Sequence, residues 1–366
     1  MKTRIIFIGG FLGSGKTTLL YEAALKLAKS GRRVGLITND QASELVDTAF
    51  LEQSGGIVSE VSGSCFCCNF TGLTDAVFNM IQEKEVDVIL AEPVGSCTDL
   101  SATLFQPLKQ QFEKDLEIAP LTVLADPERL SDILNGKTSG LHASAAYIIR
   151  KQLEEADIIV INKKDLFTQD RVDTLHKRSG IEWPGAEIFD ISAKNGEGLS
   201  DWLDNVMNGL EAGVRLAEVD YEIYAEGEAV LGWLNATIML QGESVDWDHF
   251  AFDLVNALSL RFDKTHSAVA HVKLLIQTGN RFVICNLTGG IKTLNIRGTA
   301  GMGNESKMTL NARVQVDPEV LKTIVLDEIA NLCGKDISST LNALKFLSPG
   351  RPNPTYRYDH IVAKHS

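Results

Sequence analysis

Short apolar runs alternate with longer amphipathic stretches through the first 210 or so residues of the chain. Near-continuous apolar strands separated by helices are typical of a mostly parallel sheet with both faces covered. The pattern therefore predicts an α/β domain over residues 1–212, and such a sheet binds its ligand beyond the carboxyl ends of its strands. Strands are predicted at residues 5–8, 34–38, 86–91, 121–125, 158–161 and 187–191, and helices at 18–29, 73–84, 145–155 and 199–210.

The pattern changes past residue 213, where longer strands and fewer helices are predicted. Two of the strands would form a hairpin around Thr278-Gly279-Asn280. We predict a separate, smaller α+β domain over residues 213–366 that ends in a proline-rich tail without regular structure at 348–354. Its strands are predicted at 229–240, 271–277 and 281–287, and its helices at 248–262 and 318–332.

The segment Gly10-Phe11-Leu12-Gly13-Ser14-Gly15-Lys16-Thr17 fits the P-loop pattern and stands between a predicted strand and a predicted helix, as that motif requires. The backbone N–H groups of Gly10, Gly13, Ser14, Gly15 and the following Thr18 would wrap phosphates at a helix N-terminus. Lys16 would reach the β- and γ-phosphates, and the Thr17 hydroxyl would coordinate Mg²⁺. A chance glycine-rich turn is the plain alternative.

Two further loops predict which base the nucleotide carries. Asn162-Lys163-Lys164-Asp165 directly follows a predicted strand, and Ser192-Ala193-Lys194 follows the next one. A carboxylate at Asp165 can accept both N–H donors on the edge of guanine, whereas adenine offers no matching pair. Asn-Lys-x-Asp alone is more often a solvated charged turn, but the two loops together favour GTP over ATP.

Glu92-Pro93-Val94-Gly95 ends another predicted strand. Glu92 suits a carboxylate that holds Mg²⁺ through water or orients the attacking water, and the Gly95 N–H would sense the γ-phosphate. The candidate catalytic residues are therefore Lys16, Glu92 and Gly95, with an ordinary strand-end carboxylate as the alternative. Asn39-Asp40 with Glu44 and Asp47 forms an acidic segment where a first switch region is expected.

Cys65-Phe66-Cys67-Cys68 places three thiols within four residues. Three thiolates suit a soft or borderline ion such as Zn²⁺ or Co²⁺ and leave a tetrahedral ion one ligand short, which favours transfer over permanent binding. The alternatives are a strained vicinal disulfide or cysteines packed as small apolar residues. Cys97 is either a fourth ligand in one nucleotide state or an ordinary small residue. Cys285 and Cys333 are predicted to be core residues.

Composition excludes several other classes of function. A formal net charge of −13 argues against a nucleic-acid partner, which would need a basic face. We expect no membrane association, because no apolar run approaches the length needed to cross a bilayer. Six cysteines in 366 residues, three of them clustered, do not form a secreted disulfide framework, and we place the protein in the cytoplasm.

The P-loop, the Cys-x-Cys-Cys motif, Glu92-Pro93-Val94-Gly95 and Asn162 to Asp165 together resemble the CobW-type GTPases, which are relatives of UreG and HypB. The resemblance spans about residues 1–212. It implies a P-loop GTPase associated with metal delivery, in which Cys65, Cys67 and Cys68 bind the metal, Lys16 and Thr17 serve phosphate and Mg²⁺, and Asn162 with Asp165 reads guanine. The chain departs from the family at Asn39-Asp40 and at Ser96-Cys97.

Three functions follow from this resemblance. The leading one is a GTP-hydrolysing metallochaperone that delivers Zn²⁺ or Co²⁺ to a client metalloprotein. The second is a GTP-dependent activator of a cobalamin or other metalloenzyme that carries no metal itself. The third is a metal-sensing regulatory GTPase. The resemblance also implies a nucleotide-dependent homodimer, while the sequence leaves the oligomeric state and the client open.

Overall fold

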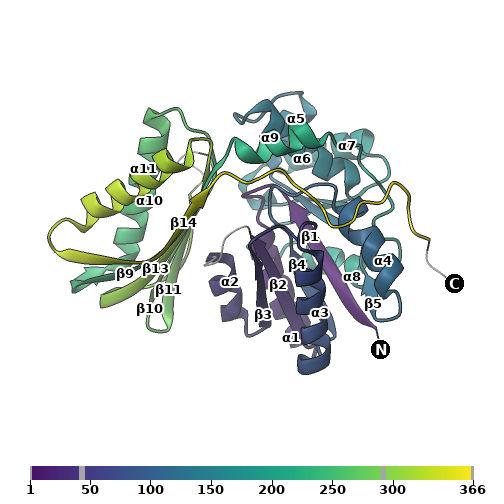
Figure 1. The fold of residues 1–366 in the computed structure, drawn as a ribbon, viewed down its shortest axis with the longest axis horizontal. Coiled ribbons are helices and arrows are strands. Elements are labelled where there is room, and N and C mark those ends of the chain that lie inside the picture. Colours follow the sequence, from purple (N-terminus) through teal and green to yellow (C-terminus); the bar gives the residue numbers. More distant parts are fainter. Residues whose placement is uncertain (1, 41–45, 290–293, 364–366) are drawn as a thin grey trace.

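Eight parallel strands form the central sheet of the first domain in the computed structural model, which describes residues 2–40, 46–289 and 294–363 (Figure 1). They run in the order β3-β2-β4-β1-β6-β7-β8, with β5 paired beside β1. The mostly parallel sheet and its six predicted strands are confirmed, and β3 and β5 were not predicted. The strands are β1 (Thr3–Gly10), β2 (Val34–Asp40), β3 (Ile57–Ser62), β4 (Val88–Glu92), β5 (Leu116–Ile118), β6 (Thr122–Ala125), β7 (Ile158–Ile161) and β8 (Glu187–Asp190).

Helices cover both faces of this sheet because alternate residues of each strand point to opposite sides. In β1, Phe7 joins a core with Phe66 and Phe105, whereas Ile8 joins another core with Trp202. The helices are α1 (Lys16–Lys29), α2 (Val46–Leu51), α3 (Phe70–Lys84), α4 (Gln106–Phe112), α5 (Pro127–Leu134), α6 (Ala143–Glu155), α7 (Gln169–Glu182), α8 (Leu199–Asn208) and α9 (Tyr221–Ala229). Short helical turns lie at Glu52–Ser54, Ser101–Phe105 and Lys164–Leu166.

The second domain is an antiparallel sheet in the order β12-β11-β10-β13-β9-β14, with two helices packed on its outer face (Figure 1). This confirms the predicted α+β character, and the predicted hairpin pairs Thr278 with Arg281. Cys285 and Cys333 are buried in its core as predicted. The elements are β9 (Gly232–Asp246), α10 (Trp247–Lys264), β10 (Val269–Thr278), β11 (Arg281–Leu287), β12 (Asn295–Thr299), β13 (Met302–Val314), α11 (Pro318–Cys333) and β14 (Ile337–Leu347).

The inner face of the second sheet lies against the first domain. Asn311 in β13 accepts a hydrogen bond from the backbone N–H of Val46 at 2.8 Å. Two residues along, the Arg313 guanidinium forms an ion pair with Asp40 at 2.8 Å. Residues at this spacing share one face of a strand, so polar side chains on β13 fasten α2 and the end of β2 to the second domain.

Two later segments of the chain, helix α9 and the C-terminal tail, pack against the rest of the first domain. Helix α9 packs on α6 so closely that a Cβ at Gly227 would lie 2.5 Å from the backbone oxygen of Ser144. The C-terminal tail, residues 348–363, runs back from β14 across the first domain (Figure 1). As predicted, residues 348–354 have no helix or strand. The domain boundary at residues 212 and 213 stays a prediction.

Across the described residues, no helix combines the length and the apolarity that a bilayer-spanning segment needs.

Glu155, at the end of α6, is a fully buried carboxyl that should make stability depend on pH. It accepts hydrogen bonds from the Thr98 hydroxyl at 3.0 Å and the Ser101 N–H at 2.8 Å. Burial, together with the nearby Asp99, raises its pKa from 4.5 to about 8. Between these values the folded state keeps a proton that the unfolded state has released, so the free energy of unfolding falls as pH rises.

We therefore expect Glu155→Gln to remove part of this pH dependence. Urea unfolding at pH 5.5 and pH 8.5 would measure it, and the loss of stability caused by the variant should be smaller at pH 8.5. One pKa unit corresponds to about 1.4 kcal/mol, so even part of the shift is measurable. Glu154→Gln at the neighbouring position is the control, because Glu154 is only half-buried and pairs with Arg150 and Lys151 near the surface. An equal loss at both pH values would contradict the prediction.

Candidate functional site

The P-loop between β1 and α1 is already folded for phosphate binding. Gly10, Gly13 and Gly15 adopt φ angles of 125°, 80° and 99°, which strongly favour glycine. A Cβ at Gly10 would lie 2.3 Å from the Leu124 carbonyl oxygen, so the loop also needs the missing side chain there. The Lys16 ammonium folds back and donates to the Gly10 carbonyl at 2.8 Å. The lysine is thus held at the loop that would receive the phosphates.

Next to the P-loop, a hydroxyl and a carboxylate meet at the end of β4. The Thr17 hydroxyl donates to Glu92 Oε1 at 3.3 Å, and Lys16 lies 3.8 Å from the same oxygen. Glu92 Oε2 is buried without a hydrogen-bond partner in the described part of the chain. Burial, together with Asp47, raises the pKa of Glu92 to about 7. Hard oxygen donors beside an open carboxylate oxygen fit a Mg²⁺ ion.

A lysine from the second domain, Lys273, also belongs to this polar group, and it was not predicted from the sequence. Lys273 in β10 contacts both carboxylate oxygens of Asp47 at 2.6 Å and lies 3.4 Å from the Thr17 hydroxyl. The available signal was the alternation in β10, where Val272 and Leu274 pack in the second core while His271 and Lys273 occupy the opposite face. This alternation marks one face of β10 as polar, but it does not indicate that this face covers the cavity.

The Lys273–Asp47 pair predicts a non-additive effect on stability. Lys273→Met should lower the free energy of unfolding of the nucleotide-free protein by about 1–3 kcal/mol, because it leaves a mostly buried carboxylate without its partner. Lys273→Met with Asp47→Asn should lower it less. Urea unfolding of the four proteins of this cycle tests the coupling. Additive losses would contradict it.

Asn162 bridges two loops of the predicted base site. Its amide donates to the Ser14 carbonyl at 2.9 Å, and its carbonyl oxygen accepts from the Ala193 N–H at 3.0 Å. Lys163, at a φ of 59°, donates to the Gly13 carbonyl at 2.8 Å and pairs with Asp126 at 2.8 Å. Both residues therefore tie the base loop to the P-loop, and Asp126 supports Lys163.

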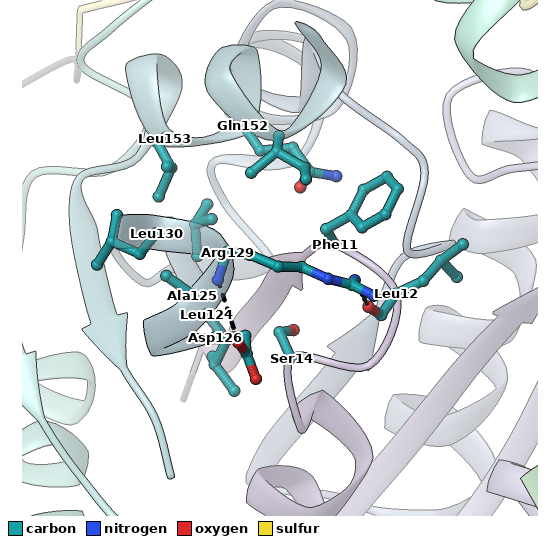
Figure 2. A pocket seen from close by; sticks show the side chains of 12 residues that line it. Phe11, Leu12, Ser14, Leu124, Ala125, Asp126, Arg129, Leu130, Gln152 and Leu153 are labelled. Carbon is teal, nitrogen blue, oxygen red and sulfur yellow. Dashed lines mark hydrogen bonds between the residues drawn. The ribbon is translucent and has the colours of Figure 1, made fainter. Parts of the chain in front are cut away.

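Arg129 connects three parts of the chain, and Figure 2 shows it beside Phe11 and Leu12 of the P-loop. Its guanidinium stacks on the Phe11 ring at 5.4 Å and donates to the Leu12 carbonyl. It also donates to the Ala270 carbonyl of β10 at 3.0 Å. Arg129 belongs to helix α5. Asp126 caps the first turn of this helix, and Pro127 occupies its first position. The P-loop is thereby supported by α5 and by the second domain.

One cavity of about 580 Å³ collects most of the predicted nucleotide-site residues, and its volume suits a small molecule of nucleotide size. Asp165 is exposed at its rim. The predicted residues that line it are Gly13, Gly15, Lys16, Thr17, Thr18, Glu92, Gly95, Asn162, Lys163, Asp165, Ala193 and Lys194. Gly10, Ser14 and Ser192 are buried and do not line it. The second domain adds His271, Lys273, Thr288 and Arg297, which the sequence reading did not identify.

The three clustered cysteines meet at the turn between β3 and α3. The sulfur of Cys65 lies 3.1 Å from that of Cys67 and 3.2 Å from that of Cys68, and the last two are 3.9 Å apart. Zn–S bonds of about 2.3 Å in a tetrahedral site place sulfurs about 3.8 Å apart, so small movements would admit an ion. Hydrogen bonds with Cys67 and Cys68 lower the pKa of Cys65 well below its ordinary value.

Access to the thiols is from the side of Cys68. Cys65 and Cys67 are buried, whereas Cys68 is half-buried. The C-terminal tail crosses this side: the N–H of Asn353 donates to the Cys68 sulfur at 3.3 Å, and that of Thr355 donates to the Cys67 carbonyl at 2.8 Å. The six cysteines are free thiols, so no vicinal disulfide is present.

Asn39 joins the cavity to the thiol turn. It lines the cavity at the end of β2. Its amide donates to the carbonyls of Val61 and Ser64 at 2.8 Å each, and its oxygen accepts from the Phe66 N–H at 2.8 Å. In the predicted first switch, Asp40 and Asp47 pair with the second domain, while Glu44 lies outside the described residues.

Comparison with known proteins identifies relatives of the first domain. A family model described as "CobW/HypB/UreG, nucleotide-binding domain" matches residues 4–189. The zinc chaperone YeiR of Escherichia coli is 29% identical over 179 residues, covering 48% of this chain and 51% of that protein. The zinc chaperone CobW of Pseudomonas aeruginosa is 26% identical over 228 residues, covering 54% and 58%. The chain thus spans about half the length of the curated relatives it matches.

Among solved structures, the hydrogenase maturation factor HypB of Archaeoglobus fulgidus matches 57% of this chain and 91% of its own, at 20% identity and a TM-score of 0.40.

Proposed function

Because the chain belongs to the CobW/HypB/UreG family, we propose that it is a GTP-hydrolysing metallochaperone. In this proposal Cys65, Cys67 and Cys68 carry Zn²⁺, and GTP binding and hydrolysis control its transfer to a client metalloprotein. Zinc is favoured over cobalt because two relatives are described as zinc chaperones. We place the protein in the cytoplasm, with a homodimer that depends on nucleotide.

Different residues of the cavity bind the phosphates, the base and the Mg²⁺ ion of the nucleotide in this proposal. The P-loop N–H groups hold the phosphates, and the Lys16 ammonium moves from the Gly10 carbonyl to the β- and γ-phosphates. Asp165 accepts from the guanine edge, while Asn162 keeps the base loop against the P-loop. The Thr17 hydroxyl, and Glu92 through water, would hold a Mg²⁺ ion, which would neutralise part of the phosphate charge. Glu92 orients the attacking water, and the Gly95 N–H senses the γ-phosphate.

The observation that carries the proposal is the position of Asn39. One side chain lines the nucleotide cavity and holds the turn that presents the thiols. A ligand that shifts the end of β2 must therefore shift the sulfur positions too. Metal affinity should change with the nucleotide state, and by linkage the bound metal must change GTP affinity by the same factor.

The test compares Zn²⁺ affinity, by competition with a chelating dye, in the nucleotide-free, GDP and non-hydrolysable GTP-analogue states. We expect affinities that differ between states by at least roughly fivefold, the lower end of typical allosteric couplings. Cys65→Ser with Cys67→Ser should abolish zinc binding and leave GTP binding intact. Equal affinities in all three states would reject the coupling. A partner activated equally by the double variant would indicate a gating protein without metal.

A further inference from the structure

The thiol site lacks a fourth ligand, and the chain places one nearby. Cys65, Cys67 and Cys68 form a group whose ligand atoms all lie within 4.8 Å of one another. A tetrahedral ion held by three sulfurs keeps one position open. Cys97 lies outside this tight group, but its thiol interacts with those of Cys65 and Cys67. Cys65, Cys67 and Cys97 belong to one apolar cluster of buried residues, which also contains Val94.

Cys97 stands on a turn that is fixed from several sides. Its N–H donates to the Val94 carbonyl at 2.9 Å. The Gln152 amide of α6 donates to the carbonyls of both Gly95 and Cys97, at 3.0 and 2.8 Å. From α9, Glu228 accepts from the Ser96 hydroxyl at 2.5 Å. These contacts use the backbone of the turn and the side chain of Ser96. The buried Cys97 thiol takes no part in them and lies in the same cluster as Cys65 and Cys67.

The same turn begins at the nucleotide cavity. Gly95 is so close to the P-loop that a Cβ there would lie 2.7 Å from the Leu12 side chain and 3.0 Å from the Lys16 ammonium. Only one residue, Ser96, separates Gly95 from Cys97. A shift of the turn that brings the Gly95 N–H to a γ-phosphate therefore moves the Cys97 sulfur as well.

We propose that Cys97 is the fourth protein ligand of the metal ion bound by Cys65, Cys67 and Cys68, and that its ligation links the ion to the Glu92–Gly95 side of the nucleotide cavity. This inference rests on the proposed function. Each coordinating thiol gives up its proton to the solvent when the ion binds. The buried Cys285 and Cys333, in the second core, have no such neighbours among the described residues and serve as matched cysteines.

Cobalt spectroscopy of the full-length protein tests the ligand set directly. The intensity of the thiolate-to-cobalt charge-transfer band grows with the number of coordinating thiolates. Titration of the GTP-analogue form with Co²⁺ should give a four-thiolate band for the wild type and a band about one quarter weaker for Cys97→Ser. Cys285→Ser should match the wild type. Zinc X-ray absorption should give four sulfur neighbours at about 2.3 Å in the wild type and three in Cys97→Ser.

Zinc affinity supplies a second readout. Cys97→Ser should weaken binding by at least the roughly 10–100-fold that the loss of a supporting residue costs a metal site. It should also bring the ratio of zinc affinities in the GTP-analogue and GDP states close to one. Cys97→Ala repeats the measurement without a buried hydroxyl, and thermal melting of the metal-free variants checks their folding.

The outcomes separate this inference from the proposed function. Three sulfur neighbours in the wild type, or an unchanged band in Cys97→Ser and Cys97→Ala, would overturn the assignment of Cys97 while leaving a three-thiol metallochaperone in place. If metal binding did not require Cys65 and Cys67, both the assignment of Cys97 and the proposed function would be overturned. A four-sulfur site that loses one sulfur only in the Cys97 variants supports the proposal.

Discussion

Replacing Lys16 with methionine should reduce GTP turnover by about 10²–10³-fold, which is the loss typical for one charge-stabilising group in an active site. The ammonium is buried against the P-loop and lies 3.8 Å from Glu92, where charge develops on the transferred phosphoryl group. Methionine keeps the apolar stem and removes only the charge. Phosphate release at saturating GTP measures the effect, and a fluorescent GTP analogue reports whether binding is also weakened.

Lys29→Met is the control for this measurement, because Lys29 lies exposed at the other end of the same helix. It should leave turnover unchanged. Zinc binding by the nucleotide-free Lys16→Met protein should also be unchanged, since the hydrogen bonds and the ion pair of Lys16 in the described part of the chain go to the P-loop and Glu92. Wild-type turnover in Lys16→Met would refute the assignment of the P-loop as the reaction site.

Replacing Asp165 with asparagine should change the base that the protein prefers. In the proposed function this carboxylate accepts two N–H donors from guanine, and hydrogen bonds to a charged group contribute about 1.5–3 kcal/mol each. Losing this match should lower GTP affinity by roughly 10²-fold or more. Xanthine presents an acceptor where guanine presents its amino group, so the asparagine amide should bind xanthosine triphosphate more tightly than the wild type does. Competition with a fluorescent nucleotide measures both affinities.

Glu128→Gln provides a matched control, because Glu128 is another exposed acid that lines the same cavity and the change in charge is identical. It should leave the ratio of the two affinities unchanged. If Asp165→Asn and Glu128→Gln lowered GTP affinity equally, the effect would be one of net charge, and Asp165 would not read the base.

The sequence predicted the parts of the fold that depend on local pattern. Apolar runs such as β1 and β7 were found because both faces of these strands are buried. Strand β3 was missed because Ser59 and Glu60 interrupt its apolar run at the edge of the sheet. Helix α5 was missed although Asp126-Pro127 carries both an N-cap and a proline at the first helical position.

The contacts between the domains could not be predicted in the same way. The motifs identified Lys16, Thr17 and Glu92 because their roles follow from short spacing along the chain. Lys273 and Arg313 reach the first domain only because the second sheet lies over it. Nothing in the spacing of these residues indicates which strand face would cover the cavity, since that depends on how the two sheets meet in three dimensions.

The C-terminal tail has a consequence for how the second domain can move. That domain is joined to the first by the segment leading into β9 at one side and by the tail at the other, where Arg357 pairs with Asp99 at 2.7 Å. A rigid domain attached at two separate points rotates most freely about the axis that joins those points. Swinging the second sheet away from the nucleotide cavity would therefore twist the chain that rests on Cys68.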